Sequence, residues 1–420
     1  MNEQKLFTKN FILVVIGQII SLFGNSILRF ALPLYLLRTT GSAALFGIVT
    51  ACSFLPMIFL SLVGGVLADR FNKRNIMVIL DFITALVVIF LLLALNKLSI
   101  VPLFIIILMI LYGISGIYQP TVQASIPSLV SSEKILSAGA IINQIGALSN
   151  LLGPIIGGML FGTFGIIPIL TISIICFTLS AIMEIFIHIP YKKRNDNQNM
   201  IAIVKNDLSE SINYMKNEKP ILIKIIVLIS LFNLVLTAMM IVGIPVLIID
   251  ILNLSDSLLG VSQGILALGG LCGGILTAVL GEKLTLKNSH YLLLLSSICI
   301  GIMGIPLILN ASNMMSYSII TACCFLIMTF STIFSVQMIA AVQTETPQNL
   351  VGKIIACMIA FSMCAQPIGQ AIYGFIFDKF QDSIWIILLG SAITSIFIAI
   401  ASKKIFKDIK IEHTATEATR

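Results

Sequence analysis

Hydrophobic residues along this chain form a series of long runs, each about as long as a membrane-crossing helix. A helix needs about 20 mostly apolar residues to cross the hydrocarbon core of a bilayer. The pattern therefore predicts an all-α, multi-pass membrane protein with twelve transmembrane helices. The predicted spans are 11–37, 43–68, 76–95, 100–122, 138–161 and 166–189, followed by 221–250, 257–280, 290–309, 314–340, 352–376 and 383–402.

The composition agrees with this interpretation and excludes several kinds of chemistry. Hydrophobic residues make up 58% of the chain and charged residues only 10%, whereas a soluble domain has roughly 25% charged residues. The eight cysteines all lie in apolar runs without a CxxC pair, and the three histidines are scattered. No nucleotide-binding loop or catalytic nucleophile pair is visible. We therefore expect no metal site, no cofactor and no enzymatic activity.

The distribution of lysine and arginine predicts the orientation, because cytoplasmic loops carry an excess of these residues. With the N-terminus inside, the cytoplasmic segments hold 21 of the 25 basic residues and the outer loops only three. We therefore expect both termini in the cytoplasm and the protein in a bacterial plasma membrane. The net charge of +7 then belongs to the loops, and no nucleic-acid partner is expected.

An internal repeat divides the chain into two pseudo-symmetric six-helix halves. Pro33 and Pro245 lie 212 residues apart, and Pro154 and Pro367 lie 213 apart. Paired halves of this kind are one common transporter design. The predicted domains are a first half (1–189), a cytoplasmic linker (190–220), a second half (221–402) and a cytoplasmic tail (403–420). The linker places apolar residues at helical spacing, which indicates an amphipathic helix on the membrane surface or, alternatively, a flexible connection.

The segment GVLADRFNKR (65–74) interrupts the apolar pattern between the second and third spans. It resembles the G-x-L-a-D-R-x-G-R-K loop of the major facilitator superfamily, with Asn72 in place of the second glycine. Since asparagine tolerates left-handed backbone conformations, we expect the turn to be kept. The resemblance implies a cytoplasmic latch between the two halves. Its expected residues are Gly65, Asp69, Arg70, Lys73 and Arg74, with Asp81 extending the charge network.

The fifth span contains SNLLGPIIGG (149–158), in which Ser149 replaces the first glycine of the superfamily's antiporter motif G-x-x-x-G-P-x-x-G-G. Proline loosens a helix by removing a hydrogen bond, and glycines permit tight helix packing. The resemblance implies a hinge at Gly153, Pro154, Gly157 and Gly158; ordinary small-residue packing is the alternative. GQIISLFGNSI (17–27) and VQTETPQNLVGKI (342–354) further resemble the macrolide-efflux-like branch of drug:proton antiporters.

Charges within or beside the spans are candidate functional groups, because they are costly in a bilayer. Glu184 and His188 lie one helical turn apart and are a candidate proton relay, or else anchor the helix end at the interface. Arg38 and Asp250 lie at matching outer ends of spans one and seven and are a candidate outer gate, although exposed pairs are often incidental.

Polar residues in the spans that line the cavity in this family are candidate substrate contacts. We expect these contacts from Asn25, Arg29, Gln119, Gln144 and Asn233. Hydrogen bonds between helices are the alternative role for the amides, and snorkelling to the interface is the alternative for Arg29.

The resemblance implies a monomeric secondary transporter that exports amphipathic drugs, macrolides among them, in exchange for protons. Sparse buried charge suits a bulky and mostly apolar substrate. Two alternatives stay open. One is transport of a physiological solute, such as a siderophore or metabolite, in either direction. The other is a non-transporting membrane sensor, although a latch for alternating access has no use in a static receptor.

Overall fold

The computed structural model describes residues 6–95, 97–190, 200–280, 288–348 and 350–418. These residues form helices and no strand, and twelve of the helices are long and apolar enough to cross a membrane. The predicted all-α fold with twelve spans is therefore confirmed. The helices of the first half are α1 (Lys9–Thr40), α2 (Ala43–Arg70), α3 (Lys73–Ala94), α4 (Ile100–Leu129), η1 (Ser132–Lys134), α5 (Ile135–Phe164) and α6 (Ile166–Ile185).

A helix that is not one of the twelve spans lies in the linker, and six spans follow it in the second half. One span, Pro220–Ile251, is built from four consecutive helical segments, two of which are π-helical. The helices are α7 (Met200–Asn217), α8 (Pro220–Phe232), η2 (Asn233–Thr237), α9 (Ala238–Pro245), η3 (Val246–Ile251), α10 (Asp256–Leu280), α11 (Ser289–Ile308), α12 (Asn313–Glu345), α13 (Val351–Lys379), η5 (Gln381–Ser383) and α14 (Ile384–Ala418).

Short polar side chains set the starts of several helices. The side chains of Thr8, Ser42 and Asn72 each accept a hydrogen bond from a backbone N–H of the following turn, at the N-caps of α1, α2 and α3. A cap of this type satisfies one of the free N–H groups at a helix start. Gly41 ends α1 with φ of +61°, a left-handed conformation that glycine adopts without steric cost.

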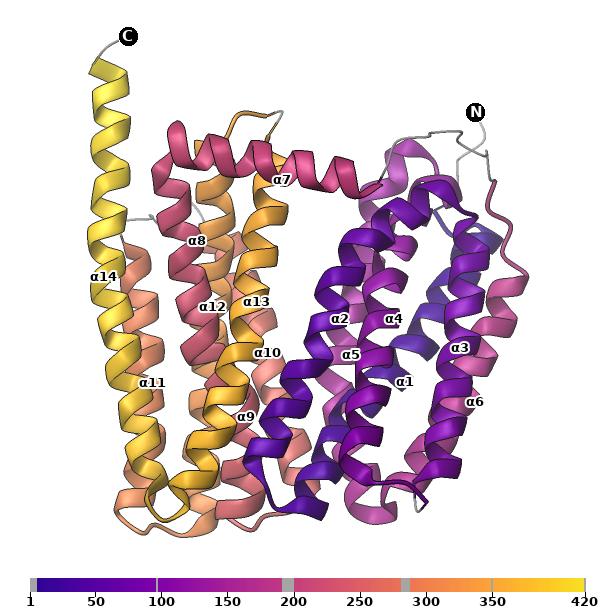
Figure 1. The fold of residues 1–420 in the computed structure, drawn as a ribbon, viewed down its shortest axis with the longest axis horizontal. Coiled ribbons are helices and arrows are strands. Elements are labelled where there is room, and N and C mark those ends of the chain that lie inside the picture. The colour runs from indigo at the N-terminus through magenta and orange to yellow at the C-terminus, as the bar shows by residue number, and fades with distance from the viewer. Residues whose placement is uncertain (1–5, 96, 191–199, 281–287, 349, 419–420) are drawn as a thin grey trace. The chain divides into compact units, whose positions relative to one another are not determined.

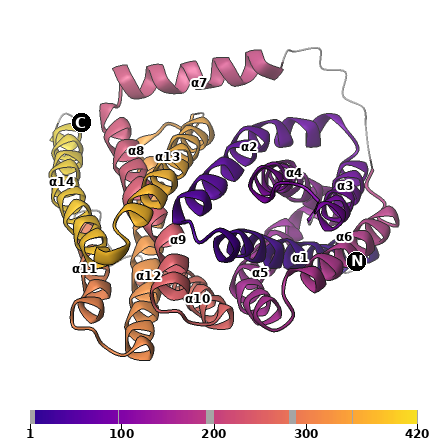
Figure 2. The ribbon, with the colours of Figure 1, turned by 60° about the horizontal axis from the view of Figure 1, so that its bottom comes forward.

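The helices group into two compact units. Unit 1 comprises Met1–Asn197 and Leu254–Gly264, and unit 2 comprises Gln198–Asn253 and Ile265–Arg420. In unit 1, α4 packs among α1, α2, α3 and α5, and α6 packs on α1 and α3 (Figure 2). In unit 2, α11 packs on both α12 and α14, and α13 packs along the α8–η2–α9 span.

The linker contains the predicted helix, and α7 lies crosswise at the ends of α8 and α13 (Figure 1). Two ion pairs hold this part of unit 2. Lys353 Nζ lies 2.6 Å from Glu210 Oε2, and Lys219 Nζ lies 3.0 Å from Glu345 Oε2. The position of α7 on a membrane surface stays a prediction.

Several helices are longer than the hydrophobic pattern indicated, and the largest differences are at the ends of α4 and α14. The fourth predicted span ended at residue 122, but α4 continues to Leu129. The last predicted span ended at residue 402, but α14 runs on to Ala418, through the predicted tail. In both cases the added residues are more polar, so a hydropathy criterion stops before the helix does.

Candidate functional site

The charged turn between α2 and α3 is only two residues long, because α2 ends at Arg70 and α3 begins at Lys73. Asn72 is in an extended conformation, with φ of −65°, and its Oδ1 accepts a hydrogen bond from Arg74 N at 3.0 Å. The turn is present, and Asn72 contributes to it as the cap of α3 and not through a left-handed conformation.

Close helix approach near this turn depends on Gly64 rather than Gly65. A Cβ on Gly64 would lie 2.8 Å from Ile117 Cα of α4, whereas a Cβ on Gly65 would meet nothing within 4 Å. Asp69 falls in the last turn of α2, and its side chain lies outside the described part of the chain. Lys73 is half-buried.

Asp81 does not belong to the charged turn, which corrects the prediction that it extends the latch. It lies eight residues into α3, about 12 Å from Lys73 along the helix axis, and is only 2% exposed. Its Oδ1 accepts a hydrogen bond from Ser21 Oγ of α1 at 3.1 Å. The carboxyl group therefore points into the interior of unit 1.

A buried polar network surrounds Asp81 inside unit 1. Tyr118 of α4 donates its hydroxyl hydrogen to Glu184 Oε1 of α6 at 2.6 Å, and Gln18 Nε2 of α1 donates to the Tyr118 oxygen at 2.9 Å. We call Gln18, Ser21, Asp81, Tyr118 and Glu184 the polar network. Ser21 and Tyr118 were absent from the sequence-based candidates. They are 60 and 66 residues from their bonded partners, so no local motif links them.

Glu184 and His188 do not share a helical face, which corrects the prediction of a relay between them. The helix α6 ends at Ile185, before His188 is reached. Glu184 is fully buried against Tyr118, whereas His188 is exposed. The backbone of His188 exchanges two hydrogen bonds with the side chain of Asn10, which fastens this segment to the start of α1.

Arg29 lies on α1 with its guanidinium over the ring of Tyr112 of α4, with Cζ 4.0 Å from the ring centroid. Within the described residues, its Nε and Nη2 are buried and have no hydrogen-bond partner. Arginine keeps its charge in proteins and has five N–H donors. The aromatic face stabilises the cation, but these two donors stay available to an acceptor.

The other predicted substrate contacts have varied surroundings. On α1, Asn25 Nδ2 donates to Ser115 Oγ at 3.1 Å. Gln119 is half-buried and Gln144 is exposed. In unit 2, Asn233 opens the π-helical segment η2, and its Nδ2 donates to the carbonyl of Ser362 at 3.3 Å. Helix–helix bonding therefore occupies Asn25 and Asn233 in this structure.

The acidic partner of Arg38 is Asp256, where the sequence-based pairing named Asp250. Arg38 Nε lies 2.9 Å from Asp256 Oδ1, and Nη2 donates to the carbonyl of Leu254 at 3.0 Å. Asp256 belongs to unit 1 and Asp250 to unit 2. A pairing of Arg38 with Asp250 stays a prediction for another conformation.

The glycines of the antiporter-like motif pack against neighbouring helices. A Cβ on Gly153 would collide with the side chain of Ser26, and a Cβ on Gly157 would lie 3.1 Å from Phe30 Cδ1, both on α1. A Cβ on Gly158 would lie 3.0 Å from Gly260 Cα, at the start of α10. Since α5 is helical on both sides of Pro154, bending at this proline stays a prediction.

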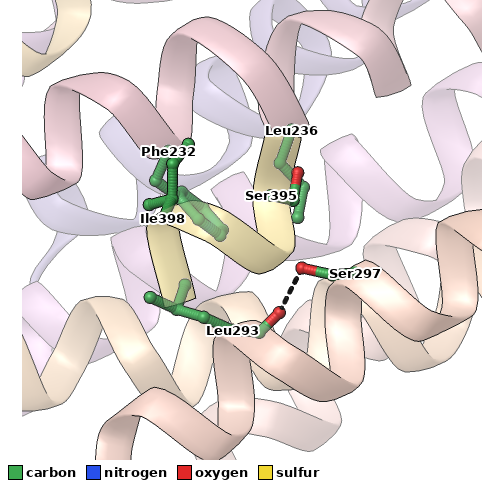
Figure 3. A pocket seen from close by; sticks show the side chains of 6 residues that line it. All are labelled: Phe232, Leu236, Leu293, Ser297, Ser395 and Ile398. Carbon is green, nitrogen blue, oxygen red and sulfur yellow. Dashed lines mark hydrogen bonds between the residues drawn. The ribbon is translucent and has the colours of Figure 1, made fainter. Parts of the chain in front are cut away.

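Unit 2 has a small pocket where the first, third and sixth spans of that half meet (Figure 3). Its volume of about 10 Å³ is too small for a drug-sized ligand. Ser297 donates back to the carbonyl of Leu293 at 2.7 Å and so adds no polar contact across the pocket. The lining residues are Phe232, Leu236, Leu293, Ser297, Ser395 and Ile398.

Comparison with known proteins gives relatives whose names describe the efflux or transport of small molecules. Macrolide efflux protein A of Streptococcus pyogenes is 23% identical, with 91% of this chain and 93% of that protein covered. Multidrug efflux pump Tap of Mycobacterium tuberculosis is 20% identical, with 86% and 85% covered. The staphyloferrin A transporter of Staphylococcus aureus is 21% identical, with 64% and 67% covered.

The fold is also similar to that of solved transporters. The nucleoside transporter NupG superposes with a TM-score of 0.77 at 14% identity, with 95% of this chain and 100% of that chain covered. The family model described as Major Facilitator Superfamily matches residues 14–370. Together with the twelve spans, this match shows that the protein is a membrane transporter and not an enzyme. The chain belongs to the major facilitator superfamily.

Proposed function

We propose that the protein exports amphipathic small molecules, macrolides among them, in exchange for protons. The observation that carries this proposal is the similarity to macrolide efflux protein A along 91% of the chain. The two units would alternate between inward-open and outward-open arrangements. The lysine and arginine distribution supports a bacterial plasma membrane with both termini in the cytoplasm.

In this proposal the turn after α2 is the cytoplasmic latch, formed by Gly65, Asp69, Arg70, Lys73 and Arg74. The turn is short, and Asn72 caps α3. Lys73 and Arg74 are therefore held in the first turn of that helix. Outer closure is assigned to Arg38, either through Asp256, its partner in this structure, or through Asp250 after rearrangement. Flexing of α5 is assigned to Pro154 and the glycines beside it.

Substrate contacts are assigned to Asn25, Arg29, Gln119 and Gln144 in unit 1 and to Asn233 in unit 2. A mostly apolar site with a few polar groups suits a bulky amphipathic molecule, because apolar contact supplies the affinity and polar groups supply the orientation. An amide side chain could leave its hydrogen bond to a neighbouring helix and bind the substrate by rotation of the side chain alone.

A second candidate function is transport of an anionic solute, such as a carboxylate-bearing siderophore. One observation favours it, namely that two buried guanidinium nitrogens of Arg29 have no hydrogen-bond partner among the described residues. A guanidinium pairs with carboxylates through two parallel hydrogen bonds, whereas it repels the amino sugar of a macrolide. The similarity to the staphyloferrin A transporter agrees with this alternative.

Labelled erythromycin distinguishes the two functions. Pump-deficient bacteria that express the protein should accumulate less erythromycin than empty-vector cells, and a protonophore should abolish the difference. Asp69→Asn should have the same effect as the protonophore. Equal accumulation with and without the protein would contradict macrolide export. The second candidate would then be tested with a labelled ferric polycarboxylate siderophore. Transport of this siderophore by the wild type, and its loss in Arg29→Gln, would establish the second candidate.

A further inference from the structure

The polar network in unit 1 has more hydrogen-bond acceptors than donors. Each of its five side chains is at most 4% exposed. The hydroxyl hydrogens of Ser21 and Tyr118 are both used, on Asp81 Oδ1 and Glu184 Oε1 respectively. Asp81 Oδ2, Glu184 Oε2 and Gln18 Oε1 are buried and have no partner among the described residues. Because unpaired buried acceptors are costly, the network lacks a donor.

The surroundings of the two carboxyl groups offer no compensating positive charge in the described part of the chain. The neutral side chains around them are Ser21, Ser180 and Tyr118, and the carboxyl groups interact with each other. The hydroxyl hydrogen of Ser180 is donated to the Gly17 carbonyl at 3.2 Å. The titratable groups facing this point are therefore Asp81 from α3, Tyr118 from α4 and Glu184 from α6. The remaining helix, α1, contributes only neutral groups. Two carboxylates in such surroundings repel each other.

We propose that the polar network is the site where the transporter binds and releases its coupling proton. This proposal rests on the proposed function of proton-driven export. A proton that binds Asp81 Oδ2 or Glu184 Oε2 converts an unpaired acceptor into an O–H donor. No bond between heavy atoms forms or breaks, and release of the proton restores the carboxylate. Tyr118 links the two carboxyl groups, since its hydroxyl can donate and accept.

The geometry also indicates how the proton would influence the substrate. Gln18 and Ser21 lie on α1, the helix that carries Asn25 and Arg29. Asn25 lies one turn beyond Ser21, and Arg29 lies two turns beyond it. A Cβ on Gly17 would lie 3.7 Å from Glu184 Cγ, so α1 passes close to this carboxyl group. Loading or unloading of the network therefore acts on the helix that contacts the substrate.

A test without substrate uses infrared difference spectra of the purified protein in lipid nanodiscs at low and high pH. Wild type should show a carboxylic-acid C=O band that disappears at high pH. Asp81→Asn and Glu184→Gln should each remove or shift this band. Glu345→Gln is the matched control, since Glu345 is a buried carboxylate paired with Lys219, and it should leave the band unchanged. A band that neither variant alters would overturn the proposal, as would a band displaced by sodium at constant pH.

A second test uses proteoliposomes and erythromycin. Asp81→Asn and Glu184→Gln should lower gradient-driven export by about tenfold or more, the scale of a typical coupling free energy. Gradient-driven export that survives in both variants would overturn the proposal. If wild type exports no macrolide, the proposed function fails, and the infrared test alone decides the proton site.

A variant that does not fold would leave one carboxyl group untested, and Tyr118→Phe covers that case. This variant keeps both carboxyl groups and removes only the hydroxyl between them. The pH at which the infrared band disappears should shift, because the hydrogen bond to Glu184 is lost. An unchanged midpoint would contradict the role of Tyr118 as the link.

Discussion

The two units fill the same junction with different side chains. In unit 1, α1, α3 and α6 enclose a network that contains Asp81 and Glu184, both at most 2% exposed. In unit 2, the corresponding spans enclose a small pocket lined mainly by apolar groups such as Phe232 and Leu293 (Figure 3). One junction therefore holds ionisable groups, and the other is lined by four apolar residues and two serines.

The sequence repeat shows which positions have diverged. An offset of 212 to 213 residues places Leu293 and Leu294 opposite Asp81, and an offset of 220 places Met338 opposite Tyr118. Leu293 and Met338 are at most 2% exposed. Since unit 2 packs this junction without charge, the fold does not need the carboxyl groups of unit 1. Buried ionic groups are weak evidence for stability, so their presence in one unit indicates a function.

The largest expected effect comes from placing a carboxyl group in the apolar junction. Leu293→Asp should lower the free energy of unfolding by about 3–5 kcal/mol, because an uncompensated buried charge costs that much. Unfolding in mixed detergent and SDS micelles would measure the loss. Leu293→Met is the control and should cost less than about 1.5 kcal/mol. An aspartate tolerated as well as methionine would mean that the junction in unit 2 also supports charge.

The next effect compares two buried tyrosines. Tyr118 donates to a carboxyl oxygen at 2.6 Å, whereas the Tyr373 and Ser391 hydroxyls of unit 2 lie 2.8 Å apart. Tyr118→Phe should cost about 1–3 kcal/mol of unfolding free energy, because it leaves a buried carboxyl oxygen without its donor, and Tyr373→Phe about 0.5–1.5 kcal/mol. The same micelle assay measures both. Equal losses would show that the two tyrosines have equivalent surroundings.

A third effect tests whether the two units share their helix packing. A Cβ on Gly116 of α4 would lie 2.7 Å from the carbonyl oxygen of Met57, and a Cβ on Gly273 of α10 would lie 2.9 Å from Thr332 Cβ. Alanine at either glycine should lower the free energy of unfolding by about 1–3 kcal/mol, because the added methyl group overpacks the contact. We expect similar losses in both units, measured as changes in the thermal unfolding midpoint.

Matched controls for these substitutions lie close by in each unit. A Cβ on Gly65 or on Gly274 would meet no atom within 4 Å. Alanine there should stabilise each helix by about 0.5–1 kcal/mol, because glycine is the poorer helix former. A large loss at these open positions would indicate a contact that the structure does not show. A loss confined to one unit would show that the two units pack differently.

Much of the fold could be predicted from the sequence, because membrane spans depend on local hydrophobicity. The twelve runs became helices, but α4 extends beyond its predicted end because its last two turns are more polar. Asparagine at position 72 shows a limit of motif reasoning. The residue replaces a family glycine, but it caps the next helix instead of adopting a left-handed conformation.

The candidate site was harder to predict, because its members come from distant helices. Glu184 was recognised as a costly charge and was paired with His188, whereas Asp81 was assigned to the charge network of the latch. The true partners, Ser21 and Tyr118, are on other helices. Similarly, Arg38 pairs with an aspartate at 256, and no repeat offset relates those two positions. Periodicity identifies the buried face of one helix, but it does not identify which face lies opposite.

The smallest expected effect compares one exposed ion pair in each unit. Arg38–Asp256 in unit 1 and Lys353–Glu210 in unit 2 are both partly exposed, so Arg38→Gln and Lys353→Gln should each cost less than about 1 kcal/mol. Arg38→Gln should cost more than Lys353→Gln, because Arg38 also donates a hydrogen bond to the Leu254 carbonyl. Thermal unfolding at about 0.1 M and about 1 M salt would measure these losses of stability. Both losses should be smaller at the higher salt concentration, because the Debye length falls from about 10 Å to about 3 Å. A salt-resistant loss at Arg38 would contradict the description of this pair as a partly exposed ion pair.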